Sequence, residues 1–262
     1  MIQAKPILNI FCLIAVFLSF GSSKANAQST AGSSASEEPR YLFNMPTAGV
    51  LQRGVYAIEG WAYGGGGSFV SLSVGLSEQL TFGIAYGAGN LIGSGSPDWN
   101  ELPGVMVRYR IFEEELNFPA ITIGFESQGR ENYLDGANRF ERKSPGFFAA
   151  ATKNYALLGF IALHGGINYS LENDDDKDLN FYFGVEKTIG KELSAYAQYD
   201  AAINDNNKTA LGDGRGYLDM GLRWSLGKGM TIELNLANIS DNFKHLDAAS
   251  RSVRLEYVHR FD

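Results

Sequence analysis

The chain is built largely from segments in which apolar and polar residues alternate. The stretch Leu179–Ile203 shows this unit most clearly, because Phe181, Phe183 and Val185 alternate with polar or small residues and a second alternating run begins at Leu193. A period of two is typical of a β-strand with one apolar and one polar face. The short segment between the runs contains glycine, so the stretch predicts an antiparallel hairpin.

The same pattern recurs along most of the chain and predicts twelve strands, most of about ten residues, the length that a tilted membrane-spanning strand requires. The predicted strands are Gly54–Tyr63, Ser68–Leu76, Gln79–Gly87, Gly104–Phe112, Pro119–Gln128, Gly146–Lys153, Gly159–Leu171, Leu179–Thr188, Leu193–Ile203, Gly216–Leu226, Met230–Asn238 and Arg251–Phe261. The run Gly146–Lys153 alternates poorly, so the direction of its faces stays open.

The connections between these strands fall into two groups. Those after even-numbered strands are short, such as Ser77-Glu78 and Gly227-Lys228-Gly229, whereas most of those after odd-numbered strands are long and polar, such as Gly129–Pro145 and Asn204–Arg215. Short turns at one end and long loops at the other are typical of an outer-membrane barrel. We therefore predict an all-β, transmembrane antiparallel β-barrel of about twelve strands with both termini in the periplasm.

The apolar faces of these strands would contact lipid. An even number of strands lets the first and the last pair and removes the open edge of the sheet. The final strand ends in the aromatic Phe261, as outer-membrane barrels commonly do, although Asp262 follows it. The outward residues predicted most clearly are Val105, Val107, Tyr109, Ile111, Ile121, Ile123, Phe125, Leu218, Met220, Leu222, Trp224, Leu226, Met230, Ile232, Leu234, Leu236, Val253, Leu255, Tyr257 and His259.

The N-terminus has the features of a secretory signal. Lys5 precedes the apolar run Ile7–Phe20, and Ala25-Asn26-Ala27 is a small-x-small cleavage site. A transmembrane anchor is the alternative, but the run is shorter than the roughly 20 residues of a spanning helix. Cleavage after Ala27 would remove the only cysteine, Cys12, and direct the chain to the outer membrane of a Gram-negative bacterium.

The predicted domains are therefore a signal peptide over residues 1–27, a lead and pre-barrel segment over 28–53 and the barrel over 54–262. Gln28–Arg40 has little to bury and is predicted to be disordered. Tyr41–Arg53 contains an apolar cluster, so two interpretations are open: it enters the barrel mouth, or it is an extended run into the first strand. We favour the second.

The charge balance excludes one class of partner. Loss of the signal peptide leaves 20 basic and 29 acidic residues, a net charge of −9, and no basic stripe follows a strand or loop. Nucleic-acid binding is therefore excluded. The abundance of glycine (31 residues) and of aromatic residues (13 %) fits strands and interfacial girdles better than helices.

The inward faces carry charges of both signs, which predicts cross-strand pairing in a largely filled lumen. Arg223 and Glu233 lie five residues on either side of Lys228, so they should be directly opposed. Closure of the barrel would bring Arg254 or Arg260 toward Glu59. Twelve strands also allow a narrow pore. The complete inward set is Glu59, Arg108, Arg110, Glu126, Glu186, Asp200, Asp219, Arg223, Glu233, Arg254, Glu256 and Arg260.

The remaining chemistry-bearing residues do not form a recognisable centre. The histidines His164, His245 and His259 show no spacing that pairs one with a nucleophile. Asp174–Asp178 begins like a calcium loop but lacks its glycine and its bidentate glutamate, which leaves a solvated loop or weak divalent bridging to lipopolysaccharide. We therefore expect no cofactor, no metal site and no enzymatic activity.

Three stretches resemble the YjbH family of outer-membrane proteins, which is associated with exopolysaccharide or capsule production. They are Asn44–Leu51 with Gly54, Pro119–Phe125 and Phe147–Asn154. The resemblance implies a role in exopolysaccharide secretion or assembly, with polysaccharide export proteins as partners besides the outer-membrane lipid, lipopolysaccharide and barrel-assembly machinery. A narrow passive porin for small solutes is the alternative function, and a barrel enzyme is the third.

Overall fold

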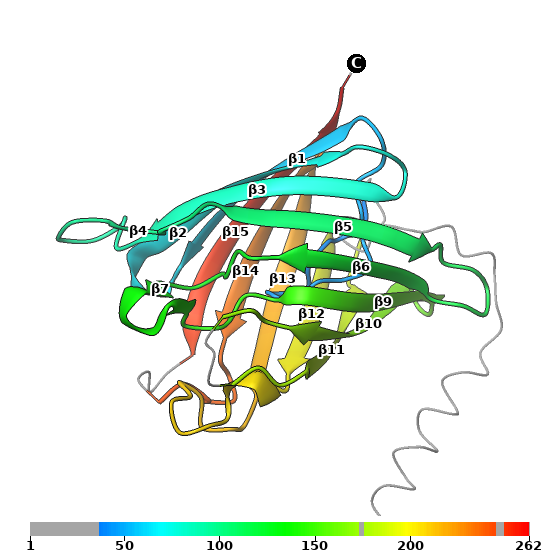
Figure 1. Ribbon diagram of the computed structural model, residues 1–262. Coiled ribbons are helices and arrows are strands. Elements are labelled where there is room, and N and C mark those ends of the chain that lie inside the picture. Colours follow the sequence, from blue (N-terminus) through cyan, green and yellow to red (C-terminus); the bar gives the residue numbers. More distant parts are fainter. Residues whose placement is uncertain (1–36, 173–175, 245–248, 262) are drawn as a thin grey trace, which may run out of the picture.

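The computed structural model describes residues 37–172, 176–244 and 249–261. Twelve antiparallel strands form a closed ring, because β15 pairs with β1 and β2 pairs with β3. The strands of the ring are β1 (Val55–Tyr63), β2 (Gly67–Gly75), β3 (Leu80–Gly89), β5 (Gly104–Phe112), β6 (Ala120–Glu126), β9 (Gly146–Ala156), β10 (Phe160–Tyr169), β11 (Asn180–Thr188), β12 (Leu193–Asp200), β13 (Tyr217–Gly227), β14 (Met230–Ala237) and β15 (Ser250–Arg260) (Figure 1).

The predicted all-β antiparallel barrel of twelve strands is confirmed, and every predicted strand is present with its ends within three residues of the expected positions. Short elements in the long loops escaped the prediction because two-residue strands and single 3₁₀ turns have too few residues to show a period. They are β4 (Asp98–Trp99), β7 (Tyr133–Leu134), β8 (Arg139–Phe140), η1 (Gly64–Gly66), η2 (Asp135–Ala137) and η3 (Ile203–Asp205).

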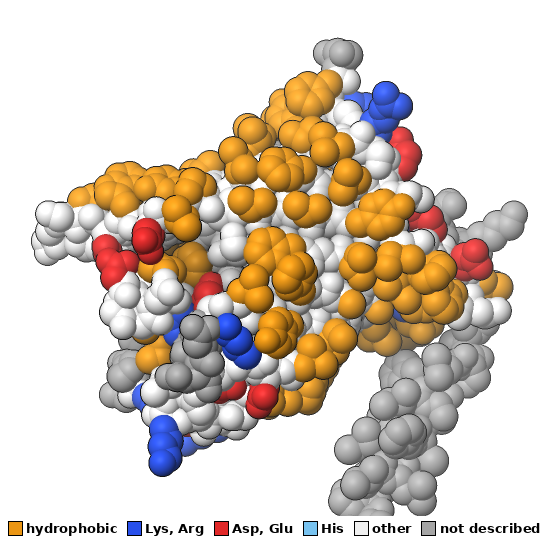
Figure 2. Space-filling model, in the orientation of Figure 1, with side chains coloured by type: hydrophobic (Ala, Val, Ile, Leu, Met, Phe, Trp, Pro, Cys, Tyr) orange, Lys and Arg blue, Asp and Glu red, His pale blue; other side chains and the backbone are white. Residues whose placement is uncertain are grey.

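The two faces of the barrel wall have opposite character. Residues such as Leu222 and Leu234 are 45 % and 57 % exposed on the outside, whereas the polar residues between them are buried in the interior. Figure 2 shows apolar side chains covering the strands and charged side chains gathered toward the ends of the barrel. The facing of β9 is also settled, with Phe148 inward and Phe147 outward. In the described part of the chain, no helix has the length and apolarity needed to span a membrane.

The hairpin of β13 and β14 shows how local sequence sets the register. Gly227, Lys228 and Gly229 all have positive φ angles of 80°, 50° and 79°. Glycine suits this conformation at the two flanking positions, and a Cβ at Gly229 would lie 1.9 Å from the carbonyl oxygen of Val258. The resulting turn is centred on Lys228, and Arg223 pairs with Glu233 across it as its symmetry predicts.

The favoured interpretation of Tyr41–Arg53 is wrong. Instead of running along the outside toward β1, the chain enters the barrel and returns, with a hydrogen bond from the Thr47 N–H to the Arg40 carbonyl and a tight turn from Leu42 to Met45. Arg40, predicted to end a disordered lead, is buried as well. We call residues 38–51 the hairpin plug. The rest of the predicted lead, up to residue 36, and the signal peptide lie outside the described residues.

The loop that joins β6 to β9 also folds inward. Within residues 127–145, which we call the inner loop, β7 pairs with β8, and Arg130, Arg139 and Arg142 are at most 5 % exposed. The plug begins and ends at the end of the barrel with the short turns, whereas the inner loop belongs to the end with the long loops. The two segments therefore fill the lumen from opposite ends.

Candidate functional site

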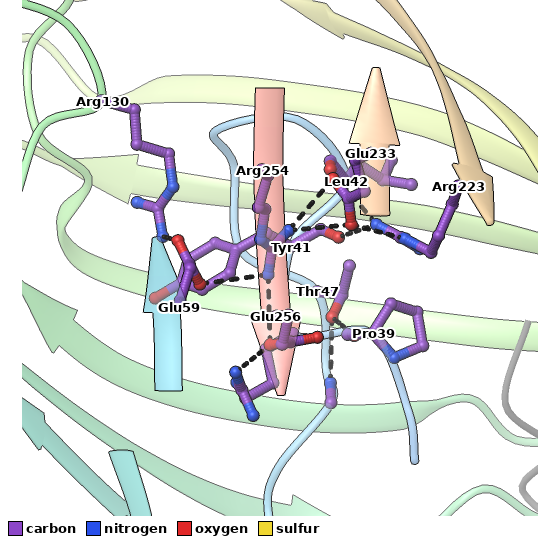
Figure 3. A network of polar contacts seen from close by, with 12 residues as sticks. Pro39, Tyr41, Leu42, Thr47, Glu59, Arg130, Arg223, Glu233, Arg254 and Glu256 are labelled. Carbon is purple, nitrogen blue, oxygen red and sulfur yellow. Dashed lines mark hydrogen bonds and ion pairs between the residues drawn. The ribbon is translucent and has the colours of Figure 1, made fainter. Parts of the chain in front are cut away.

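The predicted pair on β13 and β14 is the centre of a chain of buried charges. The Nε of Arg223 lies 2.7 Å from Oε1 of Glu233, and its NH1 lies 2.5 Å from Oε2 of Glu186 on β11. Glu233 also contacts the guanidinium of Arg254 at 3.2 Å, and Arg254 reaches Glu59 at 3.1 Å. Acids and bases therefore alternate from β11 through β13, β14 and β15 to β1. Figure 3 shows the part of this chain formed by Arg223, Glu233, Arg254 and Glu59.

Of the two arginines proposed for Glu59, only Arg254 reaches it. The register places Arg260 opposite Val55, at the start of β1, so its guanidinium donates instead to Oε1 of Gln52 at 2.8 Å. Arg108, Arg110 and Glu126 of the predicted inward set also divide: Arg108 lies 3.6 Å from Glu126, but Arg110 pairs with Glu38 of the plug and with Glu113. The symmetry of a sequence about a hairpin turn predicted ion-pair partners on the two strands of that hairpin. Partners that belong to the plug could not be predicted without knowing where the plug lies.

These pairs are dry, which changes their energetic role. The side chains of Arg223, Glu233, Arg254 and Glu59 are each at most 4 % exposed. Exposed or hydrated pairs contribute only about 0.2–1 kcal/mol. For a buried pair, removal of one partner strands the other charge and costs about 3–5 kcal/mol, although the intact pair adds little net stability. The network therefore specifies which side chains face one another.

The hairpin plug is bound by lumen side chains rather than by a strand backbone. NH1 of Arg108 donates to the Arg40 carbonyl at 2.6 Å, NH2 of Arg223 donates to the Tyr41 carbonyl at 2.8 Å, and NH2 of Arg110 donates to the Ala48 carbonyl at 2.7 Å. Figure 3 shows the plug crossing the network beside Arg223, Arg254 and Glu256. Each buried carbonyl needs a donor, and three wall arginines provide them.

Uncharged side chains of the wall accept hydrogen bonds from the N–H groups of the plug backbone. Oε1 of Gln198 accepts from the N–H groups of Phe43 and Met45, both at 3.1 Å, and the Leu51 N–H donates to the hydroxyl of Thr81 at 2.9 Å. The Ala48 N–H donates to the hydroxyl of Thr152 at 3.0 Å. Side chains of the lumen wall thus bind both carbonyl and N–H groups of the plug backbone.

Apolar contacts hold the tip of the plug. Leu42, Phe43, Met45 and Leu51 are at most 2 % exposed, and the ring of Phe43 packs edge-on against Trp61 with centroids 5.3 Å apart. Complete burial of such a side chain contributes about 1.5–3 kcal/mol. The plug is therefore packed as part of the barrel interior.

The inner loop supplies cations to the same region. The guanidinium of Arg130 lies 3.7 Å from the ring centre of Tyr41 and donates to Glu126 at 2.8 Å. Arg142 donates to Asp219 at 2.6 Å and lies 5.3 Å from the ring centre of Phe43. The sequence analysis missed these residues because it treated the loop as solvated. The available signal was a cluster of arginines within Gly129–Pro145.

Burial shifts the titration of two groups in the inner loop. Burial raises the pKa of Glu131 to about 8, although the nearby Arg142 guanidinium acts in the opposite direction. Burial also lowers the pKa of Lys143, whose ammonium donates to the carbonyls of Asp176 and Asn204. A carboxyl that ionises near neutral pH therefore lies where the loop meets the lumen.

Two spaces inside the barrel, both lined by plug residues, are small. One cavity, between the plug and the wall near His164, and a second beside Met45 each measure about 10 Å³. A cavity of this size holds at most one water molecule. Plug, inner loop and wall side chains together leave these two spaces too small for a solute.

The other residues considered for chemistry do not assemble into a catalytic centre or a metal site among the described residues. His164 faces inward, and its Nδ1 lies 2.9 Å from the hydroxyl of Thr152, whereas His259 packs outside between Tyr56 and Tyr257. Asp176 accepts from the backbone of Asn206 at 3.0 Å. Across the three described ranges, no group of three or more potential ligands could hold a metal ion. His245, Asp174 and Asp175 lie outside those ranges.

Comparison with known proteins places the fold. No protein-family model and no curated sequence matches this chain. Among solved structures, the KdgM porin matches with a TM-score of 0.50 and 8 % identity over 78 % of this chain and 98 % of its own. The KdgM porin in complex with disordered oligogalacturonate matches with a TM-score of 0.50 and 9 % identity over 79 % and 99 % of the two chains.

A NanC porin structure also matches, with a TM-score of 0.40 and 12 % identity over 79 % of this chain and 100 % of its own. The two KdgM matches overturn the resemblance to the YjbH family, since both are porins and no family model supports that assignment. The three short stretches that carried it shape strands and the plug and are too brief to define a family. At this level of identity, the comparison establishes that the chain has the fold of a twelve-stranded porin-type barrel.

Proposed function

We propose that this protein is an outer-membrane porin for small polar solutes and that its own hairpin plug closes the pore in the state described. The observation that carries this proposal is the mode of plug binding. All twelve wall strands pair with one another, so the ring is complete without the plug. The plug backbone is bound by side chains of Arg108, Arg223 and Gln198. Its departure would break no ladder of the wall.

The lumen that the plug would leave behind suits polar solutes. Its lining contains arginines and carboxylates in alternation, together with uncharged residues such as Gln198 and Thr81. A mixed lining favours small polar or weakly charged solutes, because a lining of one sign is what steers highly charged ones. The match to a KdgM porin with oligogalacturonate supports a pore of porin type. The solute of this chain is a separate question.

The test compares conductance before and after the plug is shortened. In one variant, Tyr41–Met45 is replaced by a Gly-Ser linker of equal length, which removes the apolar tip and keeps Arg40. We expect the intact protein to stay closed for most of the recording in a planar lipid bilayer and the variant to show sustained conductance. The matched control replaces the exposed loop residues Leu91–Gly95 in the same way. This control should behave like the intact protein.

The proposal fails if the folded plug variant conducts no more than the intact protein. Folding would be checked by the altered gel mobility that an unheated barrel shows. Sustained conductance of the loop control as well would also count against it, since the plug would then not be the barrier.

We further infer that the long loops face the cell exterior and the short turns face the periplasm, with lipopolysaccharide around the outer rim and the barrel-assembly machinery as the insertion partner. The sorting of loop lengths supports this orientation. An epitope tag after the exposed Gly136 should be detected on intact cells, and a tag at Lys228 only after permeabilisation. Detection of the Lys228 tag on intact cells would reverse the orientation.

A further inference from the structure

The inner loop and the hairpin plug meet inside the lumen although they enter from opposite ends. Residues 135–138 at the tip of the loop are exposed at the long-loop end, whereas Arg130 and Arg142 on its two arms are buried. The plug reaches this depth with its tightest turn, around Phe43 and Asn44. Arg130 and Arg142 of the inner loop both contact the plug near this turn.

Arg130 joins the plug to the wall. Its guanidinium lies over the ring of Tyr41 at 3.7 Å, and the Tyr41 hydroxyl donates to Glu126 at 2.7 Å. Arg130 itself donates to the other oxygen of Glu126 at 2.8 Å and lies 3.8 Å from Glu59 (Figure 3 shows Arg130, Tyr41 and Glu59 together). Departure of Tyr41 would remove a hydrogen bond to Glu126 and uncover Arg130. Departure of Arg130 would leave Glu126 with the Tyr41 hydroxyl and with Arg108, a more distant cation at 3.6 Å.

Arg142 makes a second junction of the same kind. It donates to Asp219 at 2.6 Å and lies 4.1 Å from the ring centre of Tyr217, both on β13. On the plug side, it donates to Oδ1 of Asn44 at 3.5 Å and lies over the ring of Phe43. A guanidinium between a carboxylate and an aromatic face gains from both only in this arrangement.

Arg139, in the same loop, provides the contrast. It is buried, like the other two, and donates to Oδ1 of Asp205 at 2.6 Å. Its other bonds go to the carbonyls of Phe140 and Glu141, within the inner loop itself. Burial and pairing with a carboxylate are therefore common to all three arginines, but contact with the plug belongs to Arg130 and Arg142.

We propose that the inner loop is the regulatory latch of the plug, so that release of the plug and lifting of the loop are one coupled transition. This inference rests on the proposed porin function and adds a way in which opening of the pore is regulated. Either segment leaving alone would strand buried charges and an aromatic face, which makes the two closed-state positions mutually stabilising. Coupling of this kind is reciprocal. An event at the exposed loop tip on the long-loop side would therefore weaken a plug inserted from the other end.

The test measures plug exposure directly and does not depend on conductance. Val50 in the plug is 4 % exposed, so Val50→Cys in a Cys12→Ser background reports plug release by its reaction with a water-soluble maleimide in lipid nanodiscs. We expect Arg130→Met and Arg142→Met each to raise the labelling rate about tenfold, which corresponds to about 1.4 kcal/mol. The matched control Arg139→Met removes a buried cation that does not touch the plug, so it should raise the rate less than either of the other two variants.

A second comparison separates loss of the contact between loop and plug from a general loss of structure in the loop. In a Phe43→Ala plug, the aromatic partner of Arg142 is already missing and only the contact with Asn44 is left, so Arg142→Met should raise labelling less than it does in the native plug. Equal effects in both backgrounds, or equal effects of Arg139→Met and Arg142→Met, would overturn the latch.

Failure of the latch and failure of the porin can be told apart. Labelling that rises in the latch variants while the plug-linker variant never conducts would refute the porin and leave the coupling intact. Conductance of the plug-linker variant with no change in labelling for Arg130→Met and Arg142→Met would refute the latch and leave the porin intact.

Discussion

The barrel wall and the hairpin plug differ in how their backbones are satisfied. In the wall, each strand is hydrogen-bonded to two neighbouring strands, and the ring closes through β1 and β15. In the plug, carbonyl and N–H groups are bound by side chains such as Arg108, Arg223 and Gln198. A backbone ladder is cooperative and hard to open in part, whereas a segment bound by side chains can leave as a unit. We therefore expect the wall to stay folded when the plug leaves the lumen.

The strongest test of this difference damages each part in turn. Gly124 faces Phe148 and the Val107 carbonyl, and a Cβ there would lie 2.4 Å from both. We expect Gly124→Leu to prevent formation of the barrel. Phe43→Ala should cost about 3–5 kcal/mol of plug packing and leave the barrel folded. Gel mobility of unheated samples measures the barrel, and trypsin cleavage after the buried Arg40 measures plug release.

Loss of the barrel in Phe43→Ala would mean that plug and wall fold as one unit, and the distinction between them would be wrong. A folded Gly124→Leu barrel would mean that the wall tolerates more local distortion than its close packing implies.

The charge network gives the next largest effect. Arg223→Glu would place three carboxylates together, since Glu186 and Glu233 both contact Arg223, and should lower the free energy of unfolding by about 3–5 kcal/mol or more. From the hairpin symmetry alone, adding Glu233→Arg should restore the parent behaviour. The structure changes that expectation, because the new arginine would face Arg254. Thermal unfolding should show at most partial recovery in the double variant.

Complete recovery would show that Arg223 and Glu233 act as an isolated pair. It would contradict the continuous chain of charges that links β11 to β1.

A smaller effect concerns pH and the inner loop. Because burial raises the pKa of Glu131 to about 8, the folded loop favours the protonated acid. This stabilisation is fully present below the ordinary pKa of a glutamic acid and is lost as the pH rises through about 8. The charged groups around Glu131 are Arg142, Glu141, Asp219 and Asp200. Trypsin cleavage after Arg40 should therefore accelerate as the pH rises toward about 8, by at most about tenfold per pH unit, and level off at higher pH.

Glu131→Gln is the control for this pH dependence, since it keeps the shape of the side chain and removes the titration. After correction for the activity of trypsin itself, its cleavage rate should be flat over the same range. An unchanged slope in Glu131→Gln would assign the effect to another group.

The two regions also differ in how far their sequences predicted them. Period-two alternation in runs such as Phe181–Val185 is local, so it located every wall strand and, for every strand except β9, the direction of its faces. The plug shows no such period, and its partners are remote: Phe43 is bound by Gln198, which lies 155 residues away. Its apolar residues indicated that the segment is buried but not where. Its partners are side chains of several strands, and these come together only once the ring of strands has closed.

The charged residues show the same division. Symmetry about the turn at Lys228 predicted that Arg223 faces Glu233, and no turn connects β1 with β15 to decide between Arg254 and Arg260 for Glu59. The inner loop was misjudged because arginines in a long loop ordinarily reach water. Here aromatic rings of the plug and carboxylates of the wall give them a buried alternative.

The central claim is that the hairpin plug occupies the lumen of the membrane-embedded protein, and cross-linking tests it most directly. The Ala48 N–H lies 3.0 Å from the hydroxyl of Thr152 on β9, so cysteines at these two positions should form a disulfide in lipid vesicles under mild oxidation. Cysteines at Ser225 and Thr231, paired across β13 and β14, provide the control within the wall. We predict that both pairs cross-link and that Phe43→Ala reduces only the first. A wall pair that cross-links while positions 48 and 152 remain free would contradict the account.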